Sequence, residues 1–265
     1  MPRDAEARLA DGTRIRYRVW GGERPGRRFA LVHSLAMDAA FWTPVAEALS
    51  SDCEVLALDC RGHGKSDKPP GPYRVERFAD DLAGVLDAVG WRSARVAGAS
   101  MGGCVALAFA ARHPRRLSGL GLIDTTAWYG AEAQKTWEGR AGKALEEGMA
   151  ALVEFQKTRW FSDAFRETHP DRVEAAIEVF LANDVEAYAE SCRMLGNCDM
   201  RAALPGIAVP TEIVVGEEDY ATPVAMAEAM RAAIPGAGLE VIEGARHFTP
   251  LEVPERIAAA LRRLL

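Results

Sequence analysis

A serine in a short glycine-framed turn is the residue of this 265-residue chain that is best suited to act as a nucleophile. It lies in the segment Gly98-Ala99-Ser100-Met101-Gly102, which has the pattern G-x-S-x-G. An apolar run, Ala94 to Ala97, precedes this segment, and a run typical of a helix, Cys104 to Arg112, follows it. A strand, a sharp turn and a helix in this order form a nucleophile elbow, in which small residues allow a tight turn that exposes the serine hydroxyl. The sequence therefore predicts that Ser100 attacks a substrate.

An acidic cluster and a histidine follow two predicted strands in the C-terminal third of the chain. Thr211 to Val215 has the composition of a buried strand and leads into Gly216-Glu217-Glu218-Asp219. Leu239 to Ile242 predicts another strand, and the loop Gly244 to Phe248, which contains His247, follows it. The carboxyl ends of strands in open α/β sheets are where ligands bind, so we expect these side chains at a binding edge.

His247 and Asp219 supply what a serine nucleophile needs. A serine hydroxyl is weakly nucleophilic at neutral pH, so it requires an imidazole to accept its proton and a buried carboxylate to hold that imidazole in the correct tautomer. The chain order Ser100, Asp219, His247 is one of the orders in which such triads occur. Taken alone, His247 is more simply a surface-loop histidine and Asp219 a turn residue before Pro223. Their joint position after successive strands favours the catalytic interpretation.

Several further segments resemble the α/β-hydrolase superfamily, and the resemblance covers nearly the whole chain. Phe29 to Leu35 is similar to the family's strand and oxyanion loop, although Ser34 stands where many members have glycine. Leu58 to Asp67 is similar to the D-x-R-G-x-G-x-S loop after the next strand, and Gly216 to Pro223 is similar to the acid loop. The resemblance implies an α/β-hydrolase fold with these roles: Ser100 as nucleophile, Asp219 as acid, His247 as base, and the backbone N–H groups of Leu35 and Met101 as the oxyanion hole.

Within the superfamily the chain is most similar to 3-oxoadipate enol-lactonases, which open an enol-lactone in aromatic-ring catabolism. The similarity is carried by His33 to Asp38 with Phe41-Trp42 after it, by Arg159-Trp160-Phe161, and by Cys198 to Arg201. One stretch departs from the family, because Thr125-Thr126-Ala127-Trp128-Tyr129 stands where the resemblance implies an arginine. A lactone that carries a free carboxylate favours a nearby cation, so this departure leaves the substrate open.

Predicted strands and helices alternate along most of the chain, which implies a mostly parallel sheet flanked by helices. A strand pair is expected at the N-terminus, with a hairpin turn at Asp11-Gly12. The helix after the second buried strand has apolar residues at helical spacing, so it should cover one face of the sheet. The predicted elements of this region are the strand pair within Leu9 to Val19, strands at Phe29 to Val32 and Glu54 to Leu58, and helices at Trp42 to Leu49 and Val75 to Val89.

The alternation stops between about Trp128 and Cys192, where successive helices are predicted instead. These helices are Gln134 to Glu147, Gly148 to Thr158, Pro170 to Ala182 and Val185 to Leu195. We therefore expect a core domain made of residues 1–127 and 196–265, with residues 128–195 inserted as a helical cap. Because the insertion lies between the strand ending at Asp124 and the acid strand, the cap should cover the catalytic edge and exclude water.

Aromatic and basic side chains are the candidates for binding the substrate. Each aromatic is explained equally well by ordinary packing between cap and core, and most exposed arginines only interact with solvent. The aromatic candidates are Trp128, Trp137, Trp160 and Phe161, with Phe41, Trp42 and Phe248 from the core. The cations considered for a substrate carboxylate are Arg159, Arg140 and Arg246.

From the composition we expect a cytoplasmic enzyme without nucleic-acid or membrane partners. The net charge is −6 and basic residues form no stripe for a phosphate backbone. No run approaches the roughly 20 apolar residues of a membrane span, and the first residues lack an apolar signal region. The five cysteines are widely spaced and suggest neither a disulfide framework nor a metal site. The sequence leaves the oligomeric state open.

These features together predict a serine hydrolase that cleaves a small carboxylic ester or lactone through an acyl-enzyme, without a metal or organic cofactor. The substrate implied by the resemblance is 3-oxoadipate enol-lactone. A carboxylesterase of broad specificity remains an alternative, as do a carbon–carbon bond hydrolase and a cofactor-free perhydrolase with the same triad. A non-hydrolytic receptor for small molecules is a further alternative from a different class.

Overall fold

The computed structural model describes residues 2–265 and contains an eight-stranded sheet with the order β1-β2-β4-β3-β5-β6-β7-β8. β1 pairs antiparallel with β2, and β2 antiparallel with β4, while all later neighbours are parallel. The mostly parallel sheet predicted from the sequence is confirmed. The strands are β1 (Arg3–Arg8), β2 (Arg14–Trp20), β3 (Arg28–Val32), β4 (Glu54–Leu58), β5 (Ala94–Ala99), β6 (Leu117–Ile123), β7 (Thr211–Gly216) and β8 (Gly238–Ile242).

The N-terminal strand pair starts earlier than predicted. β1 occupies Arg3–Arg8, whereas the segment from Leu9 to Gly12 forms the turn. Only Ala7 of β1 is buried, because β1 is the edge strand and its other side chains face solvent. An edge strand of this kind carries charged residues and lacks the apolar alternation from which strands are predicted.

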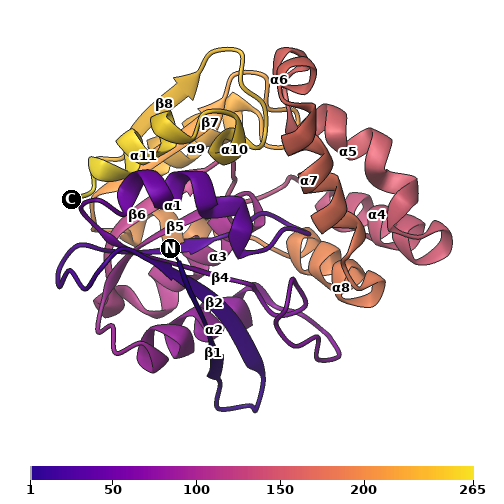
Figure 1. Cartoon of the computed structure of the whole chain (residues 1–265). Helices are drawn as coiled ribbons and strands as arrows, with labels where there is room; N and C mark the ends of the chain where they lie inside the picture. Colours follow the sequence, from indigo (N-terminus) through magenta and orange to yellow (C-terminus); the bar gives the residue numbers. More distant parts are fainter. Residues whose placement is uncertain (1) are drawn as a thin grey trace.

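The central strands form the core because both of their faces are covered. All five residues of β4 are buried, as expected for parallel strands between two helical layers. α1 packs against α11, and α2 packs against α3. Figure 1 shows α1 and α11, far apart in the sequence, side by side over the sheet. The helices of the core are α1 (Thr43–Leu49), α2 (Val75–Ala88), α3 (Met101–Arg112), α9 (Val224–Ala233), α10 (Thr249–Glu252) and α11 (Pro254–Arg262), with short 3-10 turns at Ala39–Trp42, Pro114–Arg116 and Arg201–Gly206.

Five helices between β6 and β7 lie together at one end of the sheet, as Figure 1 shows. Of their mutual contacts, those between α4 and α8 are the most extensive. The segment predicted as one helix from residue 148 begins with a 3-10 turn at Met149–Leu152, and the short helix α6 was not predicted. No helix in residues 2–265 has the length and apolar character needed to cross a membrane. The five are α4 (Ala133–Glu147), α5 (Val153–Trp160), α6 (Asp163–Thr168), α7 (Pro170–Leu181) and α8 (Val185–Gly196), called below the α4–α8 segment.

Candidate active site

Ser100 lies in a strained turn between β5 and α3. Its φ is 53° and its ψ is −115°, a positive-φ conformation that non-glycine residues rarely adopt. The turn is tight because a Cβ atom at Gly98 would overlap the carbonyl group of Gly102, and one at Gly102 would overlap the carbonyl group of Val32. The hydroxyl of Thr125 donates a hydrogen bond to the Ser100 carbonyl at 2.7 Å and helps to hold the turn. This geometry is that of a nucleophile elbow.

Side chains from three loops meet at this turn. Nε2 of His247 lies 2.9 Å from Oγ of Ser100, and Nδ1 of His247 lies 2.8 Å from Oδ2 of Asp219. All three side chains are largely shielded from solvent. The structure therefore brings together the serine, imidazole and carboxylate that the sequence analysis singled out. In this arrangement the imidazole can accept the serine proton while the carboxylate orients it.

The loop after β7 holds Asp219 as a carboxylate. Its Oδ1 accepts hydrogen bonds from the backbone N–H groups of Ala221 and Thr222, and its Oδ2 accepts one from the Thr222 hydroxyl at 2.8 Å. Burial acts to raise the pKa of Asp219, but the nearby His247 and the hydrogen bonds outweigh it, so that the pKa is lowered. An ionised Asp219 favours the imidazolium that forms when His247 accepts a proton.

A second buried carboxylate, Asp124, lies at the end of β6. Its Oδ1 accepts a hydrogen bond from the backbone N–H of Gly216 at 3.1 Å. Its Oδ2 interacts with both the backbone N–H and the hydroxyl of Thr249, at 3.0 and 2.6 Å. Burial and the charge of Asp219 raise the pKa of Asp124 well above its usual range. Asp124 therefore connects the strand that carries the acid loop with the loop that carries His247.

The backbone N–H groups of Leu35, in the loop after β3, and of Met101, the first residue of α3, donate no hydrogen bond within residues 2–265. Unpaired amides at a helix start and an adjacent loop are the usual components of an oxyanion hole. Leu35 and Ser100 both line the same cavity.

The loop that contains Leu35 is held by His33. The Nδ1 atom of His33 lies 2.7 Å from the Ser34 carbonyl oxygen, and the backbone N–H of Cys60 donates to Nε2 at 3.0 Å. These partners assign the proton to Nδ1, since Nε2 must accept. Burial lowers the pKa of His33, which keeps the ring neutral. The neutral ring thus connects the loop after β3 with the loop after β4.

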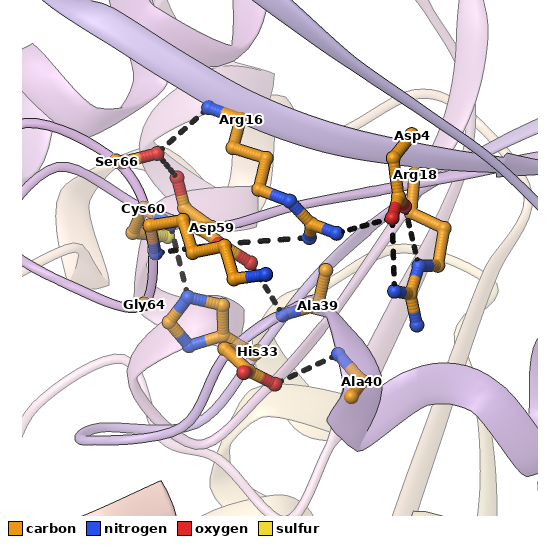
Figure 2. A network of polar contacts seen from close by, with 12 residues as sticks. Asp4, Arg16, Arg18, His33, Ala39, Ala40, Asp59, Cys60, Gly64 and Ser66 are labelled. Atoms are coloured by element: carbon orange, nitrogen blue, oxygen red, sulfur yellow. Dashed lines mark hydrogen bonds and ion pairs between the residues drawn. The ribbon is translucent and has the colours of Figure 1, made fainter. Parts of the chain in front are cut away.

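Asp59 forms a second connection between the same loops, shown in Figure 2. Its Oδ1 accepts a hydrogen bond from the backbone N–H of Ala39, and its Oδ2 accepts one from that of Lys65. The Ser66 hydroxyl donates to the Asp59 carbonyl oxygen and accepts from the backbone N–H of Arg16 in β2. The segment with the pattern D-x-R-G-x-G-x-S therefore has a structural role, because it anchors the loop next to Ser100.

A cavity of about 600 Å³ opens above Ser100 and is covered by the α4–α8 segment. Ser100, His247 and Leu35 contribute to its wall on the sheet side. Four of the substrate-binding candidates from the sequence also line it, namely Trp137, Trp160, Arg140 and Arg159. Further lining residues, which the sequence analysis did not assign to the pocket, include Tyr129, Lys143, Phe155, Gln156, Tyr220 and Met226.

Trp128, Phe161 and Phe248 do not line this cavity. Phe248 stacks on Trp160 with ring centroids 4.9 Å apart, and Phe161 meets Phe248 edge-on at 5.5 Å. Both phenylalanines are fully buried, so they form packing between the α4–α8 segment and the core. Trp128 lies in the wall of a separate cavity of about 420 Å³, where the Arg201 guanidinium covers its ring at 3.7 Å.

The three arginines considered for a substrate carboxylate differ in their surroundings. Arg140 lines the cavity, donates from Nε to the Tyr188 hydroxyl at 2.7 Å, and lies over the Trp137 ring at 5.0 Å. No acidic side chain in residues 2–265 pairs with it. Arg159 also lines the cavity and lies over the Phe155 ring at 4.2 Å.

Arg246 is buried and does not line the cavity, although it is the neighbour of His247 in the sequence. Its Nη1 donates to the Thr158 and Phe161 carbonyl oxygens and to Asp163, and its Nε pairs with Glu218. Next to it, Glu252 accepts hydrogen bonds from the backbone N–H groups of Ser162 and Arg246. Arg246 and Glu252 therefore attach the α5–α6 connection to the His247 loop.

Within residues 2–265, no three His, Cys, Asp or Glu side chains form a group that could hold a metal ion. All five cysteines have free, buried thiols.

Residues 28–254 match a family model described as the alpha/beta hydrolase fold. The chain is similar to 3-oxoadipate enol-lactonase 2 of Acinetobacter baylyi, with 30% identity over 97% of this chain and 94% of the relative. Among solved structures it is similar to the enol-lactonase from Burkholderia xenovorans LB400, with 34% identity, a TM-score of 0.92, and coverage of 98% of this chain and 99% of the other. It is also similar to a thermophilic esterase from Thermogutta terrifontis, with 30% identity, a TM-score of 0.91, and coverage of 98% and 97%.

Proposed function

Since this chain belongs to the α/β-hydrolase fold family, we propose that it hydrolyses a carboxylic ester or lactone through an acyl-enzyme on Ser100. The observation that carries the proposal is the 2.9 Å contact between Oγ of Ser100 and Nε2 of His247, with Asp219 behind the imidazole. The similar enol-lactonases and esterase support the same class of reaction.

The proposed reaction begins when His247 accepts the proton of Ser100 as Oγ attacks the carbonyl carbon. The carbonyl oxygen becomes an oxyanion, which the amides of Leu35 and Met101 stabilise. The bond to the alcohol or enol oxygen then breaks, and His247 gives that oxygen the proton. Water next attacks the acyl-enzyme, again with His247 as base, and releases the carboxylic acid and free Ser100.

The proposed natural substrate is 3-oxoadipate enol-lactone, as in the similar enol-lactonases. This lactone carries a carboxylate, and Arg140 is a cation in the cavity wall without an acidic partner in residues 2–265. A guanidinium suits a carboxylate because its donors match the two oxygens. We assign the α4–α8 segment, expected as a cap over residues 128–195, the role of closing this cavity around the substrate.

A carboxylesterase of broad specificity is the second candidate. It is favoured by the similarity to the thermophilic esterase and by Trp137 and Trp160, whose rings offer apolar contacts to many acyl or alkyl groups. The two candidates differ in their preference for one substrate. We expect kcat/KM on the enol-lactone to approach the diffusional ceiling of about 10⁸ M⁻¹s⁻¹ and to exceed that on p-nitrophenyl acetate by far. Similar values on both substrates would favour the broad esterase.

The nucleophile is tested by labelling with a fluorophosphonate. The wild-type protein should form one adduct, located on Ser100 by peptide mass spectrometry, and Ser100→Ala should form none and lose about 10⁶-fold in kcat, as in an unrelated serine protease. Ser34→Ala is the matched control, because it removes the other serine hydroxyl that lines the cavity. Unchanged turnover by Ser100→Ala would refute the proposed function.

A further inference from the structure

Tyr129 is a polar side chain of the reaction cavity that the proposed mechanism does not use. It follows β6, after Asp124, in the stretch that departs from the family resemblance, and it lines the cavity together with Ser100 and His247. Its ring meets the Trp137 ring edge-on, with centroids 5.2 Å apart, and this contact holds the ring in place.

The Tyr129 hydroxyl lies at the first turn of α3. Its oxygen is 3.9 Å from the Cys104 sulfur, and Cys104 follows Ser100 by one helical turn. The Cys104 thiol also reaches the Thr126 carbonyl oxygen at 3.4 Å, a better acceptor for its single proton. Burial raises the pKa of Tyr129 well above its usual range, so the phenol keeps its own proton.

That proton is available to a substrate. Within residues 2–265 the Tyr129 hydroxyl contacts the Cys104 sulfur, which is a weak acceptor, and lies within reach of the Ser100 hydroxyl. It therefore lies beside the nucleophile and donates to no carbonyl or carboxylate oxygen of these residues. When Ser100 attacks, an oxygen atom of the bound substrate can accept the hydrogen bond of the phenol.

The order of the strands indicates which substrate oxygen lies near the Tyr129 hydroxyl. β5, which carries Ser100, lies between β3 and β6. Leu35 follows β3, whereas Tyr129 follows β6, so the two approach Ser100 from opposite sides. In the proposed mechanism the carbonyl oxygen binds to the amides of Leu35 and Met101. The Tyr129 hydroxyl therefore faces a part of the substrate other than the carbonyl oxygen.

We propose that the Tyr129 hydroxyl donates a hydrogen bond to the bridging oxygen of the ester or lactone while its bond to the acyl carbon breaks. The inference rests on the proposed function. Tyr129 keeps its proton throughout, and the proton that ends on the leaving oxygen comes from His247. The hydrogen bond strengthens as negative charge grows on this oxygen, so Tyr129 is a further catalytic residue that stabilises the leaving group.

Leaving groups of different basicity test the inference. A p-nitrophenolate leaves without help, whereas an alkoxide or enolate carries more charge in the transition state. Tyr129→Phe should therefore lower kcat/KM on ethyl and phenyl esters of one acid by about 10- to 100-fold, the size of a hydrogen bond to a developing charge. On the p-nitrophenyl ester of the same acid the loss should stay below about threefold. A plot of log kcat/KM against leaving-group pKa should become steeper.

Tyr73→Phe is the matched control, because it removes a phenol hydroxyl that donates to the Pro69 carbonyl oxygen away from the cavity. It should leave the slope of the plot unchanged. An equal loss of activity by Tyr129→Phe on all esters, or no loss on any, would overturn the inference. Fluorophosphonate labelling separates this failure from that of the proposed function: if Ser100 is labelled but the slope does not change, only the role of Tyr129 is wrong.

Discussion

The carboxylate of Asp124 interacts with both the backbone N–H and the hydroxyl of Thr249, two residues after His247. Its other oxygen accepts a hydrogen bond from Gly216, at the end of the acid strand. Three neighbouring segments of the sheet edge are thus fixed relative to one another by one side chain. Within residues 2–265, Asp124 forms no hydrogen bond with the imidazole of His247, whereas Asp219 lies 2.8 Å from its Nδ1.

Substitution of the two aspartates should give different losses. Asp219→Asn removes the charge that holds the imidazole in the correct tautomer, so kcat should fall about 10⁴-fold, as for the same change in another serine hydrolase. Asp124→Asn keeps one acceptor oxygen but places an NH₂ group against the backbone N–H of either Gly216 or Thr249. We expect it to lower the free energy of unfolding by about 1–3 kcal/mol and kcat by much less than Asp219→Asn. Steady-state kinetics and denaturant titration measure both, and equal losses in kcat would assign the acid role to Asp124.

Asp124 should also make stability depend on pH. Because its pKa is raised in the folded protein, its contribution to stability is complete below the unfolded pKa, near 3.8, and is lost as the pH rises through the folded pKa. Asparagine does not titrate. The free energy of unfolding of Asp124→Asn, measured relative to that of the wild type, should therefore increase from pH 4 to pH 8. A difference that is constant over this range would show that Asp124 titrates normally.

His63 should make the fold sensitive to acid. Burial lowers the pKa of His63 from 6.5 to about 3, and no partner in residues 2–265 bonds to its Nε2. The unfolded chain therefore binds a proton between pH 6.5 and 3 that the folded chain does not, and stability is lost as the pH falls through this range. The loss is roughly 1.4 kcal/mol per pH unit. His63→Asn, which can keep the donor to the Arg61 carbonyl oxygen, should flatten the dependence of unfolding free energy on pH.

Arg140 and Arg246 form a matched pair for testing recognition of a carboxylate. Arg140→Met should raise KM for the enol-lactone acid by about 10- to 100-fold, but change KM for its methyl ester little, because only the acid offers a charged partner. Arg246→Met should affect both substrates equally and lower the melting temperature, since it leaves buried carbonyl oxygens without donors. Equal effects of Arg140→Met on acid and ester would mean that Arg140 does not bind the carboxylate.

Much of the fold could be predicted because its central strands are buried on both faces. β4 occupies Glu54–Leu58, the same residues that the apolar run predicted. β1 was misplaced because an exposed edge strand has no apolar pattern, and α6 was missed because six residues are too few for a helical period. Local patterns identify elements that bury a face, and they miss elements held by tertiary contacts alone.

The candidate site could likewise be predicted only in part. Ser100, Asp219 and His247 could be named because each follows a strand, and parallel strands bring their carboxyl ends to one edge. The cavity wall could not be predicted, because Trp160 and Phe161 are neighbours of similar chemistry and only one of them faces the cavity. Arg246 shows the same limit. It precedes His247 directly in the sequence, yet its side chain pairs with Glu218 and Asp163 and does not line the cavity.

The attachment of the α5–α6 connection to the His247 loop restricts how this protein can be recombined with its relatives. A chimera that imports a foreign α5–α6 connection also imports foreign carbonyl oxygens and amides opposite Arg246 and Glu252. If these groups did not match, Arg246 would shift, and His247 would shift with it because it is the next residue in the chain. We therefore expect turnover to be kept in chimeras whose exchanged segment begins in α4, ends in α8 and retains the native residues from Thr158 to Asp163. Such chimeras should acquire the substrate selectivity of the relative.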